Sequence, residues 1–247
     1  MSPSDAPFRV IAEQLLPHGR LAAVELPAVS PDASLLETLA NGERTLHAAE
    51  RELAQGLAVP RRISFIGGRV ALRAALASVL PATRDVAVLR TPRGAPLLPP
   101  GILGSVSHKR RLAVALAALP TAEVHTVGID IEEIPGEREL GRLDLAPKIL
   151  TPFERRELAS LEARDALAYR EAVRLRFALK EAVYKAIDPH VQRYVRFQEV
   201  EVFPDSAGAT DVRFSLPEFA GRRISVRARW SRLDSHLIAT AVCSPLG

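Results

Sequence analysis

The chain has 247 residues, of which 47% are hydrophobic and 25% charged, and its formal net charge is +4. This length can hold one large domain or two small ones with a well-buried core, and no apolar run is long enough to cross a bilayer. The single cysteine, Cys243, excludes an internal disulfide framework and a cysteine-rich zinc site. Residues 1–20 lack the sustained apolar segment of a signal peptide, so we expect a cytoplasmic enzyme or binding protein.

The first half is predicted to combine helices with short strands. Leucines spaced among polar residues predict one helix over 34–55, and a second helix is expected over 69–80, before Pro81. The proline-rich segment 91–101 predicts a loop without regular structure. Short apolar segments, the first of which ends at Gly67-Gly68, predict three strands over 63–66, 86–89 and 112–119.

Positive charge is concentrated in this half. Within residues 53–122 ten side chains are Arg or Lys, and only Asp85 is acidic. Such a block is typical of a surface that binds a polyanion, although a solvated basic face has the same composition. Because Phe65 is the only aromatic residue of the block, stacking surfaces for single-stranded nucleic acid are scarce. A compact phosphorylated small molecule fits at least as well, and we expect no nucleic-acid partner.

The second half begins with a predicted strand over 124–131, and the polar, turn-rich segment 132–147 is the best candidate for a linker. Thr151 and the residues after it form a capping-box pattern, so one or two helices are expected from there to Ile187. Pro189 is expected to end them. Alternating apolar residues in the tail predict antiparallel strands around residues 195–203, 212–214, 224–230 and 237–242.

A weak internal repetition connects the two halves. Ser107-His108 precedes the apolar segment 112–119. Ser235-His236 precedes a similar segment, 237–243. Duplication into two similar α+β halves would explain the repetition, and a chance match in a sequence rich in Ala, Val and Leu explains it almost as well.

The sharpest local pattern is VGIDIE at residues 127–132. On a strand its three β-branched residues face one way, toward a core, and Gly128, Asp130 and Glu132 face the other. Two carboxylates that project together from a rigid element repel each other, which is poor surface design but suits Mg²⁺, a cation that prefers hard carboxylate oxygens. An amphipathic edge strand with acidic exposed positions is the structural alternative, and the hexamer alone does not decide between them.

The second pattern is FALKEAVYKA at residues 177–186. The chain has four lysines and twenty-nine arginines, yet two of the lysines, Lys180 and Lys185, lie in this segment. On a helix Lys185 shares a stripe with Glu181, and a plain Glu-to-Lys pair of this spacing contributes about 0.2–0.5 kcal/mol. Lysine, unlike arginine, gives up its proton readily when partly buried. A functional interpretation has Lys185 in the first place, and Lys180 in the second, contact a phosphate, with Lys185 also able to transfer a proton. The alternative is a plain ion pair with lysines that stand there by chance.

The third pattern is GSVSHKRR at residues 104–111. A hydroxyl from Ser107, an imidazole from His108 and the three basic residues that follow suit phosphate binding at the end of a loop. A nucleophile–base pair is the competing interpretation. Adjacent strand residues point to opposite faces, so Ser107 and His108 are badly placed for it, and Ser105 is no better.

Taken together and in this order, the three motifs resemble those of the Sfp-type phosphopantetheinyl transferases. The correspondence consists of SVSH at 105–108, VGIDIE at 127–132 and FALKEAVYK at 177–185. The loop GAPLLPPGILGSVSH at 94–108 is similar to the branch typified by enterobactin synthetase component D. The motifs cover about forty residues, and none is decisive alone, but the ordered set is specific.

The resemblance implies an α+β fold made of two similar halves, a pseudodimer with the active site in the cleft between them. Residues 1–123 would form the basic, coenzyme A-binding half, and residues 124–247 would carry the metal-binding carboxylates. The implied reaction moves 4′-phosphopantetheine from coenzyme A to a serine of an apo acyl or peptidyl carrier protein, and it releases adenosine 3′,5′-bisphosphate.

The resemblance also implies roles for single residues. Asp130, Glu132 and Glu181 would hold Mg²⁺, with Mn²⁺ as a possible substitute, and Glu181 would also act as the general base. Lys185 would contact the α-phosphate and protonate the leaving group, and Asp130 and Glu181 would complete the catalytic set with it. Further coenzyme A contacts would come from Lys180, Ser107 and His108.

Two departures from the family pattern affect these expectations. Many members carry Lys within a Gly-Lys-Pro triplet, where this chain has Ala95, so Arg93 is the candidate replacement for that phosphate contact. Phe177 stands where Trp is commoner, as in the component D branch. The basic N-terminal contacts vary among members, and the candidates here by place and charge are Arg62, Arg69 and Arg73.

Two other functions are alternatives to the transferase. A Mg²⁺-dependent phosphohydrolase or nuclease would need the three carboxylates but no acceptor protein. A non-catalytic nucleic-acid-binding module would bind with a steep dependence on salt, but the few aromatics and the acidic clusters argue against it. We expect a monomer with no membrane partner. The sequence does not identify the carrier protein, which could serve fatty-acid, polyketide, nonribosomal-peptide or siderophore synthesis.

Overall fold

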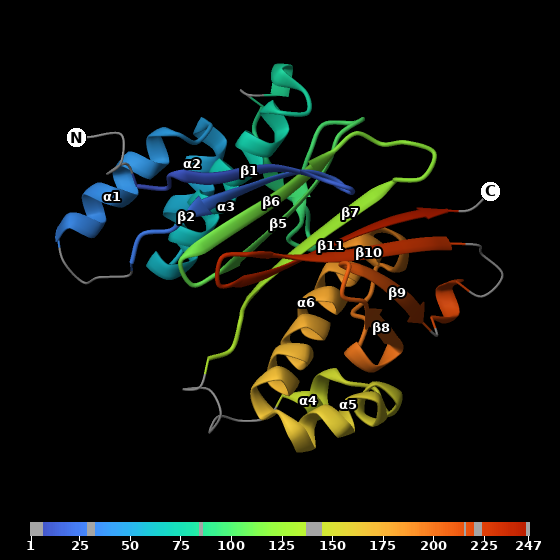
Figure 1. Ribbon diagram of the computed structural model, residues 1–247. Coiled ribbons are helices and arrows are strands. Elements are labelled where there is room, and N and C mark those ends of the chain that lie inside the picture. Colours follow the sequence, from blue (N-terminus) through green and yellow to red (C-terminus); the bar gives the residue numbers. More distant parts are fainter. Residues whose placement is uncertain are drawn as a thin grey trace. The chain divides into compact units, whose positions relative to one another are not determined.

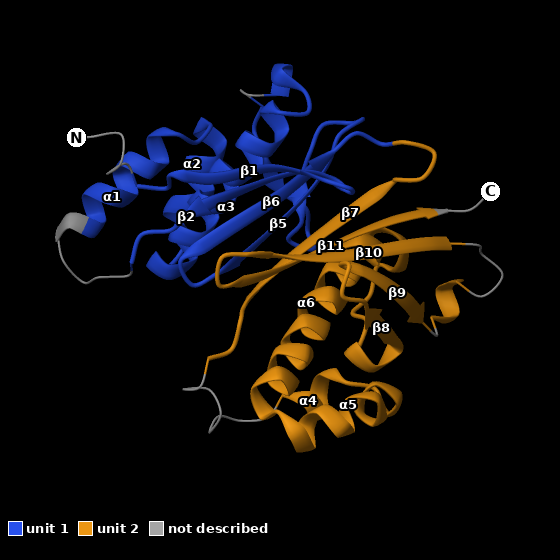
Figure 2. Cartoon of the chain, viewed as in Figure 1, with its two compact units in different colours: residues 1–120 blue, residues 121–247 orange. Residues whose placement is uncertain are grey.

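A computed structural model describes residues 7–28, 33–83, 86–136, 145–214, 216–219 and 224–245 of the chain. The chain divides into two compact units, residues 1–120 and residues 121–247 (Figure 2). This division lies three residues from the predicted boundary between residues 123 and 124. Each unit has an antiparallel sheet and a long helix of its own (Figure 1). The predicted mixture of helix and sheet is therefore confirmed. None of the helices in the described ranges is long and apolar enough to cross a membrane.

Unit 1 is a four-stranded antiparallel sheet with the strand order β1-β2-β6-β5, and a separate two-stranded ribbon pairs β3 with β4. Helix α3 packs on one face of the larger sheet, where Ile66 and Leu72 join Val24 and Ala115 in one hydrophobic core. The elements are β1 (Val10–Leu16), β2 (Gly19–Glu25), α1 (Ala33–Arg44), α2 (Ala48–Gln55), α3 (Val59–Ala77), β3 (Leu89–Arg90), β4 (Pro96–Leu97), β5 (Leu103–Lys109) and β6 (Leu112–Ala118), with a 3-10 turn at Pro81–Thr83.

Helix α3 corrects two predictions. The segment 63–66, predicted as a strand, and the Gly67-Gly68 pair that should have ended it both lie inside this helix. A short apolar run that is buried on all sides does not reveal its period, so a helix and a strand look alike in it. The glycines allow close packing, because a Cβ on Gly67 would lie 2.1 Å from the Leu26 side chain and one on Gly68 would lie 2.8 Å from Val106.

Other predictions for unit 1 were partly wrong. The single helix predicted over 34–55 is two helices, because His47 caps the second one: its ring nitrogen accepts from the Ala49 N–H at 3.3 Å, and its own N–H donates to Glu50 at 3.0 Å. The strand predicted over 86–89 is displaced to β3, and the predicted loop contains β4. Strands β1 and β2 were not predicted. The strand over 112–119 is confirmed as β6.

Unit 2 is a five-stranded antiparallel sheet with the order β7-β11-β10-β9-β8, and α6 packs on one of its faces (Figure 1). The capping box at Thr151 is confirmed, since its hydroxyl accepts from the Glu154 N–H at 3.2 Å. The elements are β7 (Thr126–Glu133), α4 (Ala146–Ile149), α5 (Pro152–Arg164), α6 (Ala166–Val191), β8 (Val200–Pro204), β9 (Ala209–Phe214), β10 (Ile224–Leu233) and β11 (His236–Pro245), with 3-10 turns at Phe197–Glu199 and Pro217–Phe219.

Two boundaries in unit 2 differ from the predictions. Helix α6 continues past Pro189 to Val191 and ends at Gln192, which has a left-handed conformation with φ 54°. A proline removes one N–H donor and its ring crowds the carbonyl four residues earlier, but only two helical residues follow Pro189, so the disturbance is confined to the last turn. The start of the predicted linker over 132–147 belongs to β7, and its residues 137–144 lie outside the described residues.

The two units share a strand–helix–hairpin path within sheets of four and five strands. In unit 1 the chain runs from β2 through α3 to the hairpin β5–β6, and β6 pairs with β2. In unit 2 it runs from β7 through α6 to the hairpin β10–β11, and β11 pairs with β7. Each hairpin closes with a two-residue turn whose first residue has a positive φ, Arg110 in one and Asp234 in the other. The expectation of two similar halves is thus confirmed.

The Ser-His repetition does not mark equivalent positions in these halves. Ser107 and His108 precede the hairpin turn, on β5, whereas Ser235 is the second residue of the other hairpin turn and His236 follows it. The similarity of the units therefore lies in strand order, and the dipeptide match is a coincidence of sequence.

The side chains of β7 alternate between two faces as predicted, but the face with the carboxylates is buried and not exposed. All six residues from 127 to 132 are buried, and the face with Gly128, Asp130 and Glu132 is the one that α6 covers. A Cβ on Gly128 would lie 1.9 Å from the Ala182 carbonyl oxygen. The glycine thus lets the helix lie directly against the strand, which brings side chains of α6 to the two carboxylates.

Replacing Gly128 with Ala should lower the free energy of unfolding by about 1–3 kcal/mol, because the added methyl group meets helix backbone that cannot move aside. Urea unfolding of the two proteins measures the difference. Gly136→Ala is the matched control, since no atom lies within 4 Å of the added Cβ. Equal unfolding midpoints for Gly128→Ala and the native protein would contradict the close packing of α6 on β7.

Candidate active site

Five charged side chains face one another where α6 lies on β7, and we call this group the carboxylate site. Asp130 and Glu132 come from β7. Arg174, Glu181 and Lys185 come from α6, at spacings of seven and four residues that place them along one side of the helix. All five belong to unit 2, so one rigid strand and one rigid helix position the whole group.

Lys185 and Asp130 form an ion pair across the site. The Lys185 Nζ donates to Asp130 Oδ1 at 2.8 Å and to the carbonyl oxygen of Ile129 at 2.8 Å. The Asp130 side chain is 9% exposed and that of Lys185 is 27% exposed, so the ammonium stays accessible at one side. The contact places Lys185 and Asp130 side by side, and their catalytic roles stay predictions.

Glu132 is held in a similar way by a residue that the sequence analysis missed. The Arg174 Nη1 donates to Glu132 Oε2 at 2.9 Å, and the Glu132 side chain is 5% exposed. Arg174 is one of several arginines early in α6, and no short motif distinguishes it. Its spacing of seven residues before Glu181 was the available indication, because that spacing puts both on one helix stripe.

Glu181 lies between these two ion pairs and differs from the other carboxylates. Burial raises the pKa of Glu181, the negative charges of Asp130 and Glu132 raise it further, and Lys185 lowers it. No described residue donates a hydrogen bond to its carboxylate. The carboxylate site thus holds three acidic groups and two basic ones, and the acidic group without a cation of its own is Glu181.

The donor chemistry of the site fits a hard divalent cation, which would offset this excess of negative charge. In the present arrangement Asp130 and Glu132 direct oxygens to Lys185 and Arg174. Among the described residues no three His, Cys, Asp or Glu side chains are gathered closely enough to hold a metal ion. Metal binding by Asp130, Glu132 and Glu181 therefore stays a prediction, and it requires these side chains to turn toward a common point.

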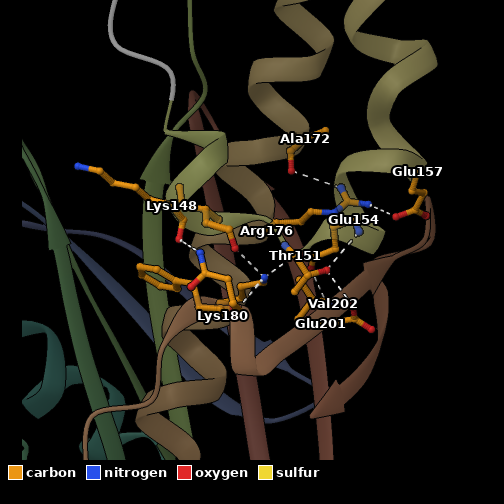
Figure 3. Close-up of polar contacts among 12 residues, drawn as sticks. Lys148, Thr151, Glu154, Glu157, Ala172, Arg176, Lys180, Glu201 and Val202 are labelled. Atoms are coloured by element: carbon orange, nitrogen blue, oxygen red, sulfur yellow. Dashed lines mark hydrogen bonds and ion pairs between the residues drawn. The ribbon is translucent and has the colours of Figure 1, made fainter. Parts of the chain in front are cut away.

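Lys180 has a different role from the one predicted. Its side chain is 1% exposed, and its Nζ donates to the Ile149 carbonyl at 2.8 Å, to Glu154 Oε2 at 2.6 Å and to the Phe197 carbonyl at 2.9 Å (Figure 3). Burial lowers the pKa of Lys180, and the charge of Glu154 opposes that effect. With three donors used inside unit 2, the predicted phosphate contact of Lys180 is replaced by a structural role.

The Glu154 carboxylate is the centre of this internal cluster (Figure 3). Its Oε2 also accepts from the Thr151 N–H at 2.8 Å, and its Oε1 accepts from the Val202 N–H at 2.9 Å. One carboxylate thus ties the start of α5 to β8 and to α6. A compact ammonium can donate to three acceptors around one nitrogen, which a planar guanidinium cannot, so lysine rather than arginine suits position 180.

Replacing Lys180 with Met should lower the free energy of unfolding by about 3–5 kcal/mol, because it leaves the buried Glu154 carboxylate without its cation. Urea unfolding measures the loss. The exposed Lys148 provides the control, since Lys148→Met removes the same charge from the surface. A Lys180→Met protein as stable as the control would show that the cluster does not hold α5 against α6.

Arg69 of unit 1 is also largely internal. It is 5% exposed, its Nε donates to the Val88 carbonyl at 2.7 Å, and its Nη2 donates to the Leu89 carbonyl at 3.0 Å. The guanidinium lies 4.5 Å from the centre of the Phe65 ring. Burial lowers the pKa of Arg69 to about 10. These contacts give Arg69 a structural role, and its contact with coenzyme A stays a prediction.

The other predicted arginines of α3 have partners in unit 1 as well. Arg73 donates to the Val86 carbonyl at 3.1 Å and forms an ion pair with the buried Glu50. Arg62 forms an ion pair with Glu43. These contacts fix α3 against its neighbours, and a role for either arginine in coenzyme A binding is not tested by them.

The remaining predicted ligands, Ser107, His108 and Arg93, belong to unit 1. Ser107 and His108 are successive residues of β5, one buried and one exposed, so their side chains point to opposite faces as expected. They belong to a strand and not to the end of a loop as predicted. Arg93 is exposed in the turn between β3 and β4, where the Ala95 N–H donates to the Thr91 hydroxyl at 3.1 Å.

Two family models match the chain. The 4′-phosphopantetheinyl transferase superfamily matches residues 126–241, which include the whole of the carboxylate site. The 4′-phosphopantetheinyl transferase N-terminal domain matches residues 49–118, which include α3, β5 and β6. Each match falls within one of the two units.

Curated relatives match over most of the chain. The 4′-phosphopantetheinyl transferase Npt of Nocardia iowensis is 34% identical over 187 residues, which are 75% of this chain and 78% of the relative. The 4′-phosphopantetheinyl transferase Svp of Streptomyces mobaraensis is 34% identical over 77% of this chain and 76% of the relative. Enterobactin synthase component D of Salmonella typhimurium is 33% identical over 72% of this chain and 70% of the relative. The chain therefore belongs to the 4′-phosphopantetheinyl transferase superfamily.

Proposed function

We propose that this chain transfers the 4′-phosphopantetheine group from coenzyme A to a serine hydroxyl of an apo carrier protein and releases adenosine 3′,5′-bisphosphate. The family supports the enzyme class and its two substrates. The observation that supports specific residues is the carboxylate site. In this site Glu181 lies near two ion-paired carboxylates, where helix α6 packs on strand β7.

Asp130, Glu132 and Glu181 would hold a divalent cation, Mg²⁺ in the first place and Mn²⁺ as a substitute. When bound, the cation would neutralise charge on the phosphates of coenzyme A, the main requirement of phosphoryl transfer. The excess negative charge and the raised pKa of Glu181 support this assignment.

Glu181 and Lys185 would move the protons of the reaction. The Glu181 carboxylate accepts the proton of the carrier serine, whose oxygen forms the new bond to phosphorus. The bond from phosphorus to the departing bisphosphate breaks, and the Lys185 ammonium donates a proton to the oxygen that leaves. Lys185 is 27% exposed, so its Nζ can exchange Asp130 for a phosphate oxygen.

The phosphates and nucleotide of coenzyme A would be bound by residues of unit 1. The candidate contacts are Arg62, Arg69, Arg73, Arg93, Ser107 and His108. Their support is the excess of basic residues in 53–122 and the match of this half to the N-terminal domain of the family. Three phosphates on one ligand suit such a block.

The carrier protein would belong to a secondary-metabolite pathway, such as polyketide, nonribosomal-peptide or siderophore synthesis, or to fatty-acid synthesis. One relative, enterobactin synthase component D, has a name that refers to a siderophore. A cytoplasmic monomer without a membrane or nucleic-acid partner completes the proposal.

A metal-dependent phosphohydrolase or nuclease would use the same carboxylates, and product analysis separates the two functions. Coenzyme A, Mg²⁺ and the protein are incubated with and without an apo carrier, and nucleotides are separated by chromatography. We expect adenosine 3′,5′-bisphosphate to form only when the carrier is present, in a molar amount equal to that of the modified carrier. No bisphosphate should form after addition of EDTA. Inorganic phosphate or bisphosphate formed without a carrier would favour the hydrolase.

A further inference from the structure

A fully buried carboxylate of unit 1, that of Glu50, is not used by the proposed reaction. Glu50 is 0% exposed and lies in the first turn of α2. Its Oε2 accepts from the His47 N–H at 3.0 Å and from the Arg73 guanidinium. Its Oε1 accepts from the Val88 N–H at 2.7 Å. A buried carboxylate is costly unless it is paired and hydrogen-bonded, so Glu50 ties α2, α3 and the segment around Val88 together.

The segment around Val88 leads into the ribbon β3–β4. Within the described ranges this ribbon pairs with no strand of the four-stranded sheet, so backbone pairing with that sheet does not fix its place. Side chains of α3 hold the segment instead. Arg73 donates to the Val86 carbonyl at 3.1 Å. Arg69 donates to the carbonyls of Val88 and Leu89 at 2.7 Å and 3.0 Å. Charged side chains from the helices therefore set the position of the ribbon.

Glu50 supports both of these arginines. It forms an ion pair with Arg73, whose guanidinium also reaches the segment. Burial lowers the pKa of Arg69 to about 10, and the negative charge of Glu50 opposes that effect. The carboxylate therefore binds the segment directly and also favours the charged form of the two side chains that hold its carbonyls.

Unit 2 contains the same arrangement around Glu154. Glu50 and Glu154 each complete the capping box of a helix, and each accepts from a cation on the long helix that follows. Through Oε1, each also accepts from the N–H of a valine in a later segment. The two valines differ in their surroundings, because Val202 lies in a strand of the five-stranded sheet, whereas Val88 precedes a ribbon outside the four-stranded one. The contact made by Glu50 is thus not backed by strand pairing.

We propose that Glu50 is a positioning residue for coenzyme A binding: it fixes the ribbon β3–β4, and thereby Arg93, relative to α3. This inference rests on the proposed function, in which Arg93 contacts a phosphate of coenzyme A. Arg93 is exposed in the turn of the ribbon, which is closed by a hydrogen bond from the Thr91 N–H to the Ala95 carbonyl at 2.9 Å. A shift of the ribbon therefore moves the guanidinium, and the paired hydrogen bonds of arginine with phosphate depend on geometry.

The test is coenzyme A binding to the intact protein without a carrier, measured by isothermal titration calorimetry. Glu50→Gln keeps the size of the side chain but has one acceptor oxygen in place of two. We expect it to bind coenzyme A about 10–100-fold more weakly, the usual effect of a misplaced charged contact, and to reach the native kcat at saturating coenzyme A. A structural role alone would reduce the yield of folded protein and leave the affinity of the folded fraction unchanged.

Glu154→Gln is the matched control, because it makes the same change in the equivalent arrangement of unit 2. It should lower stability while the folded protein keeps the native affinity for coenzyme A. An equal loss of affinity in this control would assign the effect to general destabilisation and overturn the positioning role.

A double variant tests the route through Arg93. If Glu50 acts by placing Arg93, Glu50→Gln added to Arg93→Ala should weaken binding no further than Arg93→Ala alone. Losses that multiply would show another route and overturn the inference. Glu50→Asp keeps the charge but draws the carboxylate back from the Val88 N–H, and it repeats the test if the glutamine variant does not fold.

The remaining outcomes separate this inference from the proposed function. Native coenzyme A affinity in the Glu50 variants would overturn the positioning role and leave the proposed function intact. A folded native protein that binds no coenzyme A would overturn the proposed function, and this inference with it.

Discussion

Glu181→Gln is expected to lower kcat for carrier modification by roughly 10²–10⁴-fold, the usual contribution of a general base. The amide is nearly isosteric, so the packing of α6 on β7 is preserved. It removes the negative charge and the proton acceptor from Glu181, the carboxylate of the site for which the described part of the chain shows no ion pair. Because glutamine is also a poor ligand for a hard cation, the KM for Mg²⁺ should rise as well.

Steady-state transfer to an apo carrier, followed at several Mg²⁺ concentrations, measures both effects. Glu162→Gln is the matched control, because it makes the same change at an exposed position of α5. A Glu181→Gln enzyme with a native kcat, beside an unaffected control, would remove Glu181 from the chemistry and leave its raised pKa as a consequence of packing.

Lys185→Arg is expected to lower kcat by about 10²-fold, although it keeps the positive charge. Arginine does not release a proton in proteins, so it cannot protonate the departing bisphosphate. The substitution therefore separates the charge of this residue from its proton.

Single-turnover transfer, in which enzyme exceeds carrier, isolates the chemical step for this variant. Lys148→Arg is the control for a general effect of the exchange, since Lys148 is exposed. A native rate for Lys185→Arg would show that charge alone is needed there. The Lys180→Met variant should behave in the opposite way to Lys185→Arg. We expect Lys180→Met to lose stability and to retain the native kcat in the fraction of protein that remains folded.

The part of the site that rests on local patterns could be predicted from the sequence. Asp130 and Glu132 face the same way because a strand has a period of two, and Glu181 and Lys185 share a stripe because a helix has a period of 3.6. The capping box at Thr151 is similarly local, and the structure has both of its hydrogen bonds. Such patterns fix which side chains point together within one element.

Partners from distant segments could not be predicted in this way. Lys180 and Lys185 are five residues apart, yet one is enclosed by carbonyls from α4 and a 3-10 turn while the other reaches β7. Arg174 was missed for the same reason, because nothing near it in the sequence indicates that Glu132 will be its partner. The glycines of α3 were expected to end a strand, whereas tertiary packing against Leu26 and Val106 explains them.

The most direct test of the central claim is the intact mass of apo carrier proteins after incubation with this protein, coenzyme A and Mg²⁺. The panel should contain fatty-acid, polyketide and nonribosomal-peptide carriers. We predict a mass gain of one phosphopantetheine on at least one carrier, which disappears with EDTA and with Glu181→Gln. No gain on any carrier, together with no binding of coenzyme A, would contradict the assignment of the carboxylate site to phosphopantetheinyl transfer.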